Sequence, residues 1–314
     1  MAQLKNELSW SRTRVATYET CPRLYYYQYY QKWNGWSWDA SDASKQAYLF
    51  SKMTNLPMLV GHAVHETIRR ILVGYRDADG SGPADPTDFA RREILTRTWR
   101  DAKAEKWKRS LKNHPPVFEI YYGVPESELD LKAVGARASQ CVQTFLDSAL
   151  HAELRDATER KWLAVDEPPS FDESTKHKLD GRTIWALPDF AREIDGGDCE
   201  IWDWKTGRPS PHDEMQLRSY ALFARDRWGY PAERIRLKGF YLNEGEIKEY
   251  SCDASALADI EARIRSDFLR LEELLADVEA NVPRDPDEAF PMIEAGATCR
   301  SCFFQELCER VAVR

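Results

Sequence analysis

The chain has 314 residues, of which 43% are hydrophobic and 31% are charged, and its net charge is -8. This composition indicates a soluble protein with one compact core and appended or inserted helical pieces. No apolar run approaches the roughly 18–20 residues that span a bilayer. Residues 1–10 resemble neither a signal peptide nor a transit peptide, so we expect a cytoplasmic protein with no membrane partner.

The N-terminal segment, residues 10–38, is rich in tyrosine and tryptophan. Such rings can stack on bases, but packing around a bulky group is the more frequent reason for this density. Further along, residues 61–75 place apolar side chains at helical spacing, which predicts an amphipathic helix. The Gly-, Pro- and Asp-rich sequence that follows predicts a loop.

A basic stretch covers residues 91–114, where nine basic residues stand against three acidic ones, a local excess of six. Because DNA binding requires only a local basic surface, the acidic net charge does not exclude a nucleic-acid partner. A solvated helix face with internal ion pairs explains the stretch equally well. The candidate phosphate contacts are Arg97, Arg100, Lys103, Lys106, Lys108 and Arg109.

After a predicted long helix over residues 131–156, the hydrophobic period changes to two. This change predicts strands over 162–165, 183–193, 199–205, 236–242 and 246–251. Helices are predicted at 213–228, between the third and fourth strands, and at 254–278. The order of elements predicts an α/β or α+β fold whose central mixed sheet is flanked by helices.

Charged residues interrupt two neighbouring strands of this sheet. Alternation along residues 199–205 places Asp203 and Lys205 on one face and Trp204 on the other. A short hairpin would bring Asp189 beside Asp203. Two carboxylates so close repel each other, and Mg²⁺ or Mn²⁺ would relieve the repulsion, with the Trp204 backbone carbonyl as a further oxygen ligand. A metal there would polarise a phosphate while Lys205 orients the attacking water.

An isolated D-x-K triplet is often only surface sequence, so its neighbours matter. His65, on the helix over residues 61–75, could complete the metal shell, although a lone helical histidine is more often structural and His62 competes for the role. Gln216 and Tyr220 lie four residues apart on one helix face and could contact a phosphate or hold Lys205. The K-T-G triplet of serine β-lactamases also occurs here, but the S-x-x-K that it requires is missing.

Seven cysteines are present, and a cytoplasmic setting disfavours disulfides. Cys141, Cys199 and Cys252 are interpreted as buried small hydrophobes. The other four are Cys21, Cys299, Cys302 and Cys308. Three closely spaced thiols near the C-terminus indicate a metal centre, with Cys21 as the candidate fourth ligand. Structural zinc sites usually have two pairs, so a three-plus-one set suits an iron–sulfur cluster at least as well.

Taken together, these residues resemble the RecB-like branch of the PD-(D/E)xK nuclease superfamily, specifically members that carry a [4Fe-4S] cluster. Such members are the CRISPR-associated RecB-like exonucleases and the nuclease domain of AddB. The motifs that carry the resemblance run along the whole chain: Thr20-Cys21-Pro22, Gly61-x3-His65, Pro188-Asp189, Asp203-Trp204-Lys205-Thr206-Gly207, Gln216-x3-Tyr220 and the cysteine trio. The basic insertion and Phe190 depart from the usual pattern.

The resemblance implies that His65, Asp189 and Asp203 bind metal and that Lys205 is the catalytic lysine. Gln216 and Tyr220 would be a supporting pair, and the four cysteines would hold the cluster. It also implies a restriction-endonuclease-like core over 61–75 and 131–280, and a basic helical insertion over 76–130. Residues 1–60 and 281–314 would then form a helical iron–sulfur subdomain from both termini.

The expected activity is that of a Mg²⁺- or Mn²⁺-dependent deoxyribonuclease. We expect an exonuclease on single-stranded or frayed DNA ends, with endonuclease activity possible, in CRISPR adaptation, DNA repair or phage DNA processing. The chain has no helicase P-loop, so a motor, an integrase or another recombination partner would be a separate chain, and oligomers occur in the family. The alternative is a non-catalytic DNA-end-binding or assembly subunit stabilised by an iron–sulfur or zinc centre.

Overall fold

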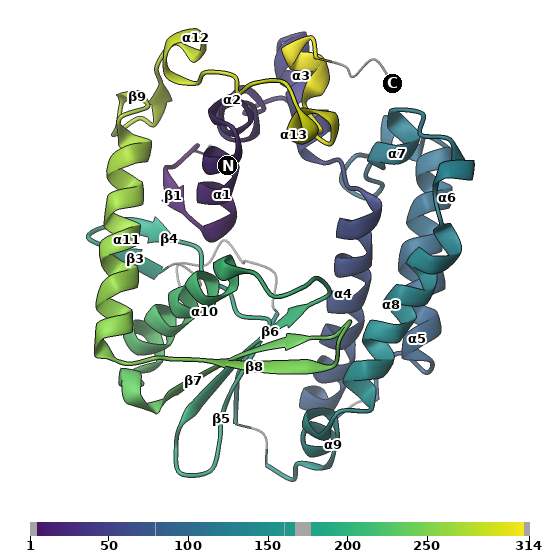
Figure 1. The fold of residues 1–314 in the computed structure, drawn as a ribbon, viewed down its shortest axis with the longest axis vertical. Coiled ribbons are helices and arrows are strands. Elements are labelled where there is room, and N and C mark those ends of the chain that lie inside the picture. Colours follow the sequence, from purple (N-terminus) through teal and green to yellow (C-terminus); the bar gives the residue numbers. More distant parts are fainter. Residues whose placement is uncertain (1–4, 79, 160, 167–176, 311–314) are drawn as a thin grey trace.

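The computed structural model describes residues 5–78, 80–159, 161–166 and 177–310. Its centre is a five-stranded mixed sheet in the order β2-β5-β6-β7-β8 (Figure 1). The β6 and β7 strands are parallel, and the other neighbours are antiparallel. The strands are β2 (Trp162–Val165), β5 (Phe190–Glu193), β6 (Cys199–Lys205), β7 (Ile235–Tyr241) and β8 (Glu246–Tyr250). The predicted mixed sheet is therefore present.

A tight turn joins β5 to β6 and fixes the register of the central hairpin. Gly196 and Gly197 both have positive φ, 86° and 80°, a conformation in which a side chain would be strained. The turn aligns Phe190 with Trp202 and Glu193 with Cys199. Register matters here because a shift of one residue would move every side chain of the strand to the other face.

Helices cover both faces of the sheet. On one face lie α4 (Leu56–Asp77), α8 (Leu131–Leu146) and α9 (Ala149–Asp156), which share a core with Trp202 and Trp204 of β6. On the other face, α10 (Pro211–Phe223), its continuation η6 (Ala224–Trp228) and α11 (Ala254–Glu272) pack on Cys199 and Ile201 of the same strand. Because successive side chains of β6 point to opposite faces of the sheet, this strand contributes to two separate hydrophobic cores.

Three elements differ from the predictions. Instead of one strand over 183–193, the structure has β4 (Arg182–Ile184) and β5, which belong to different sheets. Pro188 lies between them and cannot donate to a ladder, which accounts for the interruption. The predicted helix over 131–156 is divided between α8 and α9, where the Ser148 side chain caps a new helix. The closing helix ends at Glu272, and the chain continues into β9 (Leu275–Asp277).

The two ends of the described chain meet at one end of the molecule (Figure 1). Their elements are α1 (Arg12–Thr20), α2 (Pro22–Tyr26), η1 (Tyr27–Gln31), α3 (Asp42–Ser51), α12 (Pro286–Ala289), α13 (Ala297–Arg300) and η8 (Gln305–Cys308). Tyr27 and Phe50 pack against Phe304, with ring centroids 5.9 and 6.0 Å away. Most rings of the aromatic N-terminal segment are therefore packing groups, although Trp38 is 90% exposed.

Residues 80–130 form short helical pieces: α5 (Pro86–Asp88), η2 (Phe89–Thr96), α6 (Arg97–Lys103), η3 (Lys106–Lys108), α7 (Phe118–Tyr121) and η4 (Glu126–Glu128). The η2 segment buries Ile94 and Leu95 against α4 and α8. Near the end of the segment, Tyr122 donates a hydrogen bond to the Phe303 carbonyl at 3.0 Å. The insertion therefore contacts both the sheet's helices and the C-terminal segment. None of the described helices has the length and apolar character needed to cross a bilayer.

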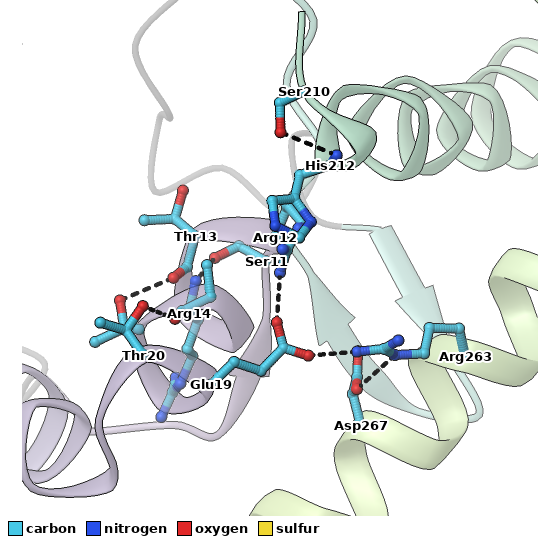
Figure 2. Close-up of polar contacts among 12 residues, drawn as sticks. Ser11, Arg12, Thr13, Arg14, Glu19, Thr20, Ser210, His212, Arg263 and Asp267 are labelled. Atoms are coloured by element: carbon cyan, nitrogen blue, oxygen red, sulfur yellow. Dashed lines mark hydrogen bonds and ion pairs between the residues drawn. The ribbon is translucent and has the colours of Figure 1, made fainter. Parts of the chain in front are cut away.

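A small three-stranded sheet and a series of ion pairs connect α1 to the rest of the protein. In this sheet β1 (Ser9–Trp10) pairs with β4, which pairs with β3 (His177–Leu179); β10 (Val282–Pro283) and β9 form a separate two-stranded sheet. Glu19 on α1 accepts from Arg12 at 3.2 Å and from Arg263 on α11 at 2.5 Å (Figure 2). Arg263 also pairs with the buried Asp267 at 2.9 Å. Because Cys21 directly follows α1, these contacts fix its position relative to α11.

Candidate active site

The β5–β6 hairpin brings two aspartates together. Since Phe190 pairs with Trp202, the preceding Asp189 lies beside Asp203 on the adjacent strand. Asp189 is oriented by the backbone, because its Oδ2 accepts a hydrogen bond from the Trp204 amide at 2.6 Å. This contact crosses from one strand to the next, so the position of Asp189 depends on the hairpin register.

Alternation along β6 separates the charged side chains from the apolar ones. Trp204 is directed into the core beside α8, where its ring meets that of Phe145 at 5.5 Å. Asp203 and Lys205 lie on the opposite face, and the Lys205 ammonium is 2.6 Å from Asp203 Oδ2. Asp203 is only 2% exposed, so this ion pair is largely removed from water.

The α10 helix supplies two further partners to this pair. Lys205 Nζ donates to Gln216 Oε1 at 2.8 Å, and Gln216 Nε2 donates to the Tyr220 hydroxyl at 2.5 Å. The Tyr220 hydroxyl in turn reaches Asp203 Oδ1 at 3.4 Å. The spacing of four residues puts Gln216 and Tyr220 on one helix face, and the four side chains form a closed ring of polar contacts.

His65 approaches the two aspartates from α4. Its Nδ1 atom is 3.3 Å from Asp189 Oδ1. The nearby His62 is more exposed than His65 and, among the described residues, is not one of the side chains grouped around Asp189 that could hold a metal. Leu59, Ala63 and Val64 anchor this part of α4 in the core, and the helix thereby presents His65 to the strand ends.

Asp166 also belongs to the site, although its sequence context did not predict it. It follows β2 directly, and its backbone N–H donates to the Asp189 carbonyl at 2.8 Å. The ligand atoms of His65, Asp166 and Asp189 all lie within 4.8 Å of one another. The available signal was an acidic residue at the end of a strand, which points to a site only once β2 is known to pair with β5.

The crowding of carboxylates perturbs the pKa values of the site. Burial and the charge of Asp189 raise the pKa of Asp203 to about 6, although Lys205 opposes this effect. Burial and Asp189 also raise the pKa of Asp166. Burial by itself would lower the pKa of His65, but the Asp189 carboxylate outweighs it and raises that pKa to about 9. The site therefore favours positive charge among its carboxylates.

A divalent cation fits this set of donors. An imidazole nitrogen and carboxylate oxygens are ligands that Mn²⁺ accepts, and Mg²⁺ accepts the oxygens. The carboxylates of Asp166 and Asp189 converge with the His65 imidazole, whose protonated form supplies one compensating charge, while Lys205 pairs with the neighbouring Asp203. The His-Asp-Asp group could therefore hold a metal ion, with Asp203 adjacent to it.

The four cysteines of the terminal segments line one pocket, together with Leu24, Tyr27 and Phe304. Donors approach two of the sulfurs: the Phe304 amide lies 3.4 Å from Cys302 Sγ, and Arg310 Nη1 lies 3.8 Å from Cys299 Sγ. Hydrogen bonds of this kind stabilise thiolates that carry negative charge. The remaining cysteines are Cys141 and Cys199, which are buried, and Cys252, which is partly buried.

The candidate phosphate contacts of the basic stretch divide into two groups. Three lysines form ion pairs with carboxylates of the same region: Lys103 with Glu126 at 2.6 Å, Lys106 with Asp101 at 2.7 Å and Lys108 with Glu105 at 2.6 Å. Arg97, Arg100 and Arg109 are exposed. The lysines thus match the interpretation of a solvated helix face, while the arginines stay available for a partner.

Comparison with known families agrees with this geometry. The profile of the PD-(D/E)XK nuclease superfamily matches residues 9–309, which is nearly the whole chain. A search among curated proteins gives no significant match. The matched region includes the sheet, both layers of helices and the acidic site at the strand ends, as well as the four terminal cysteines. The chain therefore belongs to the PD-(D/E)XK nuclease superfamily.

Proposed function

We propose that the protein is a metal-dependent deoxyribonuclease of the RecB-like type that acts as an exonuclease on single-stranded or frayed DNA ends. One observation carries the catalytic part of this proposal. His65, three carboxylates and one ammonium lie together where β2 and β6 end and β5 begins. The preference for single-stranded ends rests on the resemblance of the motifs to RecB-like exonucleases.

The roles of the residues follow from their contacts. His65, Asp166, Asp189 and Asp203 would hold Mg²⁺ or Mn²⁺, with the Trp204 carbonyl as a further oxygen ligand. When bound, the ion would polarise the scissile phosphate and lower the pKa of a bound water. Asp189 is fixed by the Trp204 amide, which limits the directions from which its free oxygen can bind a ligand.

Lys205 would orient the attacking water and offset the negative charge that develops on the phosphate. Gln216 accepts one of its protons at 2.8 Å, which restricts the ammonium to a defined position beside Asp203. Tyr220, in contact with both Gln216 and Asp203, supports the same arrangement. Such preorganisation reduces the rearrangement needed during the reaction.

We also propose that Cys21, Cys299, Cys302 and Cys308 hold a [4Fe-4S] cluster. The four cysteines line one pocket. Structural zinc sites usually have two pairs of ligands, so the division into three cysteines and one supports a cluster. Metal-dependent closure of the two terminal segments would then stabilise the fold.

A cleavage assay tests the nuclease proposal. End-labelled single- and double-stranded DNA is incubated with Mg²⁺ or Mn²⁺ and with wild type, Lys205→Ala or Lys132→Ala, the last being an exposed lysine on α8. We expect cleavage by wild type and Lys132→Ala and its loss in Lys205→Ala. Equal cleavage by all three variants would refute the assigned site. If folded, cluster-loaded wild type cleaves no DNA but binds its ends, the non-catalytic alternative replaces the proposal.

A further inference from the structure

Lys205 has a second carboxylate partner that belongs to neither the metal site nor the sequence motif. Asp213, in the first turn of α10, places its Oδ1 atom 3.6 Å from Lys205 Nζ. Asp203 Oδ2 lies 2.6 Å from the same nitrogen. The ammonium is therefore shared between the aspartate that borders the metal site and an aspartate that does not border it.

Asp213 is itself firmly held. Its Oδ2 atom accepts from the Tyr241 hydroxyl at 2.7 Å and from the Ser210 backbone amide at 2.8 Å. Tyr241 lies directly beside Lys205, because β6 and β7 pair these two residues. The Tyr241 hydroxyl also contacts the Tyr250 hydroxyl at 2.5 Å, which connects the group to β8.

Helix capping explains only part of this arrangement. Asp213 occupies the third helical position and forms a capping box with Ser210, a role for which one oxygen is sufficient. A surface cap does not require a buried tyrosine as donor. Asp213 is only 8% exposed, and Tyr241 is fully buried. The tyrosine holds Oδ2 in place, so that Oδ1 remains directed toward Lys205.

We propose that Asp213, oriented by Tyr241, is a positioning residue for the catalytic lysine. This inference rests on the proposed nuclease function. Asp203 has two competing partners, the metal ion and Lys205, and any oxygen it commits to the metal is less available to the lysine. When Asp203 binds the metal ion, Asp213 keeps the Lys205 ammonium in its position. It acts through Lys205 and does not contact the substrate or the metal.

Kinetic measurements on three variants test the role of Asp213. Asp213→Asn keeps the size and capping oxygen but removes the charge, Tyr241→Phe removes the orienting donor, and Ser210→Ala weakens only the cap. We expect kcat to fall at least tenfold in Asp213→Asn and to a smaller extent in Tyr241→Phe, with KM for DNA and Mn²⁺ affinity unchanged. Asp213→Glu should recover part of kcat, because it restores a carboxylate at a capping position that accepts glutamate.

Ser210→Ala is the matched control, since it lowers thermal stability while leaving kcat at the wild-type value. If Asp213→Asn cleaves DNA as fast as wild type, the positioning role is wrong. If Asp213→Asn and Ser210→Ala lose kcat equally, the effect is structural, and the inference is also overturned.

A second readout does not depend on nuclease activity. Acetylation of Lys205 by a small amine-reactive reagent, followed by peptide mass spectrometry, reports how tightly the ammonium is held. We expect faster labelling in Asp213→Asn than in wild type and no change in Ser210→Ala. Faster labelling without any cleavage by wild type would reject the nuclease proposal but support the contact. Unchanged labelling in Asp213→Asn would reject the contact itself.

Discussion

Metal binding at this site should compete with a proton on His65. The pKa of His65 is raised to about 9 because the Asp189 carboxylate outweighs burial. At pH 7.5 the imidazole of the metal-free protein is therefore protonated, and binding through Nδ1 must release that proton. The difference of about 1.5 pH units weakens the apparent Mn²⁺ affinity about 30-fold relative to the neutral imidazole.

The pKa of His65 determines both the direction and the size of the pH effect on Mn²⁺ affinity. Raising the pH removes the competing proton, so the apparent dissociation constant should fall about tenfold per pH unit well below the pKa of His65, and about 80-fold in total between pH 6.5 and 8.5. Below pH 6, protonation of Asp203, whose pKa is about 6, should steepen the dependence. Above pH 9 the affinity should become constant.

Titration calorimetry with Mn²⁺ measures both the apparent dissociation constant and the number of protons released on binding. Buffers with different ionisation enthalpies should reveal release of about one proton at pH 7.5. His65→Gln should abolish the pH dependence between pH 6.5 and 8.5. His62→Gln is the matched control and should retain it, because burial lowers the pKa of His62, the opposite direction. A wild-type affinity that does not change over this range would refute the assignment of His65.

Three further outcomes concern the scaffold. Phe145→Ala removes the ring that contacts Trp204 and should lower the free energy of unfolding by about 3–5 kcal/mol in a denaturant titration, whereas Leu269→Ala, at an exposed position, should change it by less than about 0.5 kcal/mol. Cys308→Ser should remove the visible absorbance of the anaerobically purified protein and lower its melting temperature, and Cys252→Ser should not remove that absorbance. Glu19→Gln should cost less than about 1 kcal/mol by the same titration, because the ion pairs of this glutamate are partly exposed.

Local sequence rules predicted the centre of the site because its parts are close in the chain or periodic. Strand alternation alone places Asp203 with Lys205. The two adjacent glycines between β5 and β6 predict the tight turn that the structure contains. Helical spacing puts Gln216 and Tyr220 on one face. These relations span few residues, so pairing across the fold does not have to be known in advance.

Two acidic residues escaped prediction for the opposite reason. Asp166 joins the site only because β2 pairs with β5, which lies beyond a connection of more than twenty residues. Asp213 has the sequence signature of a helix cap and does form one. Because this local role already accounts for an aspartate at that position, the sequence gives no sign of its second contact with Lys205. The split of residues 183–193 between two sheets has a similar cause, since the pairing of β4 with β1 joins residues about 170 positions apart. Contacts of this kind leave no periodic pattern.

The buried position of Asp203 should make the site a source of instability when no metal is bound. Burial and Asp189 raise the pKa of Asp203 to about 6 even though Lys205 opposes the shift, whereas an unfolded aspartate has a pKa of about 3.9. The ionised form at pH 7 therefore costs about 2–3 kcal/mol of folding free energy. Because a raised carboxyl pKa destabilises the fold as pH rises from about 4 to 6 and the cost is constant above that, Asp203→Asn should raise the melting temperature of the metal-free protein at pH 8 and raise it less at pH 5. Calorimetric scans in chelator measure both values. A variant less stable than wild type at pH 8 would mean that the Lys205 ion pair outweighs the burial of the carboxylate. A more stable but inactive variant would show that stability is sacrificed at Asp203 to keep a charge where a metal ion is needed.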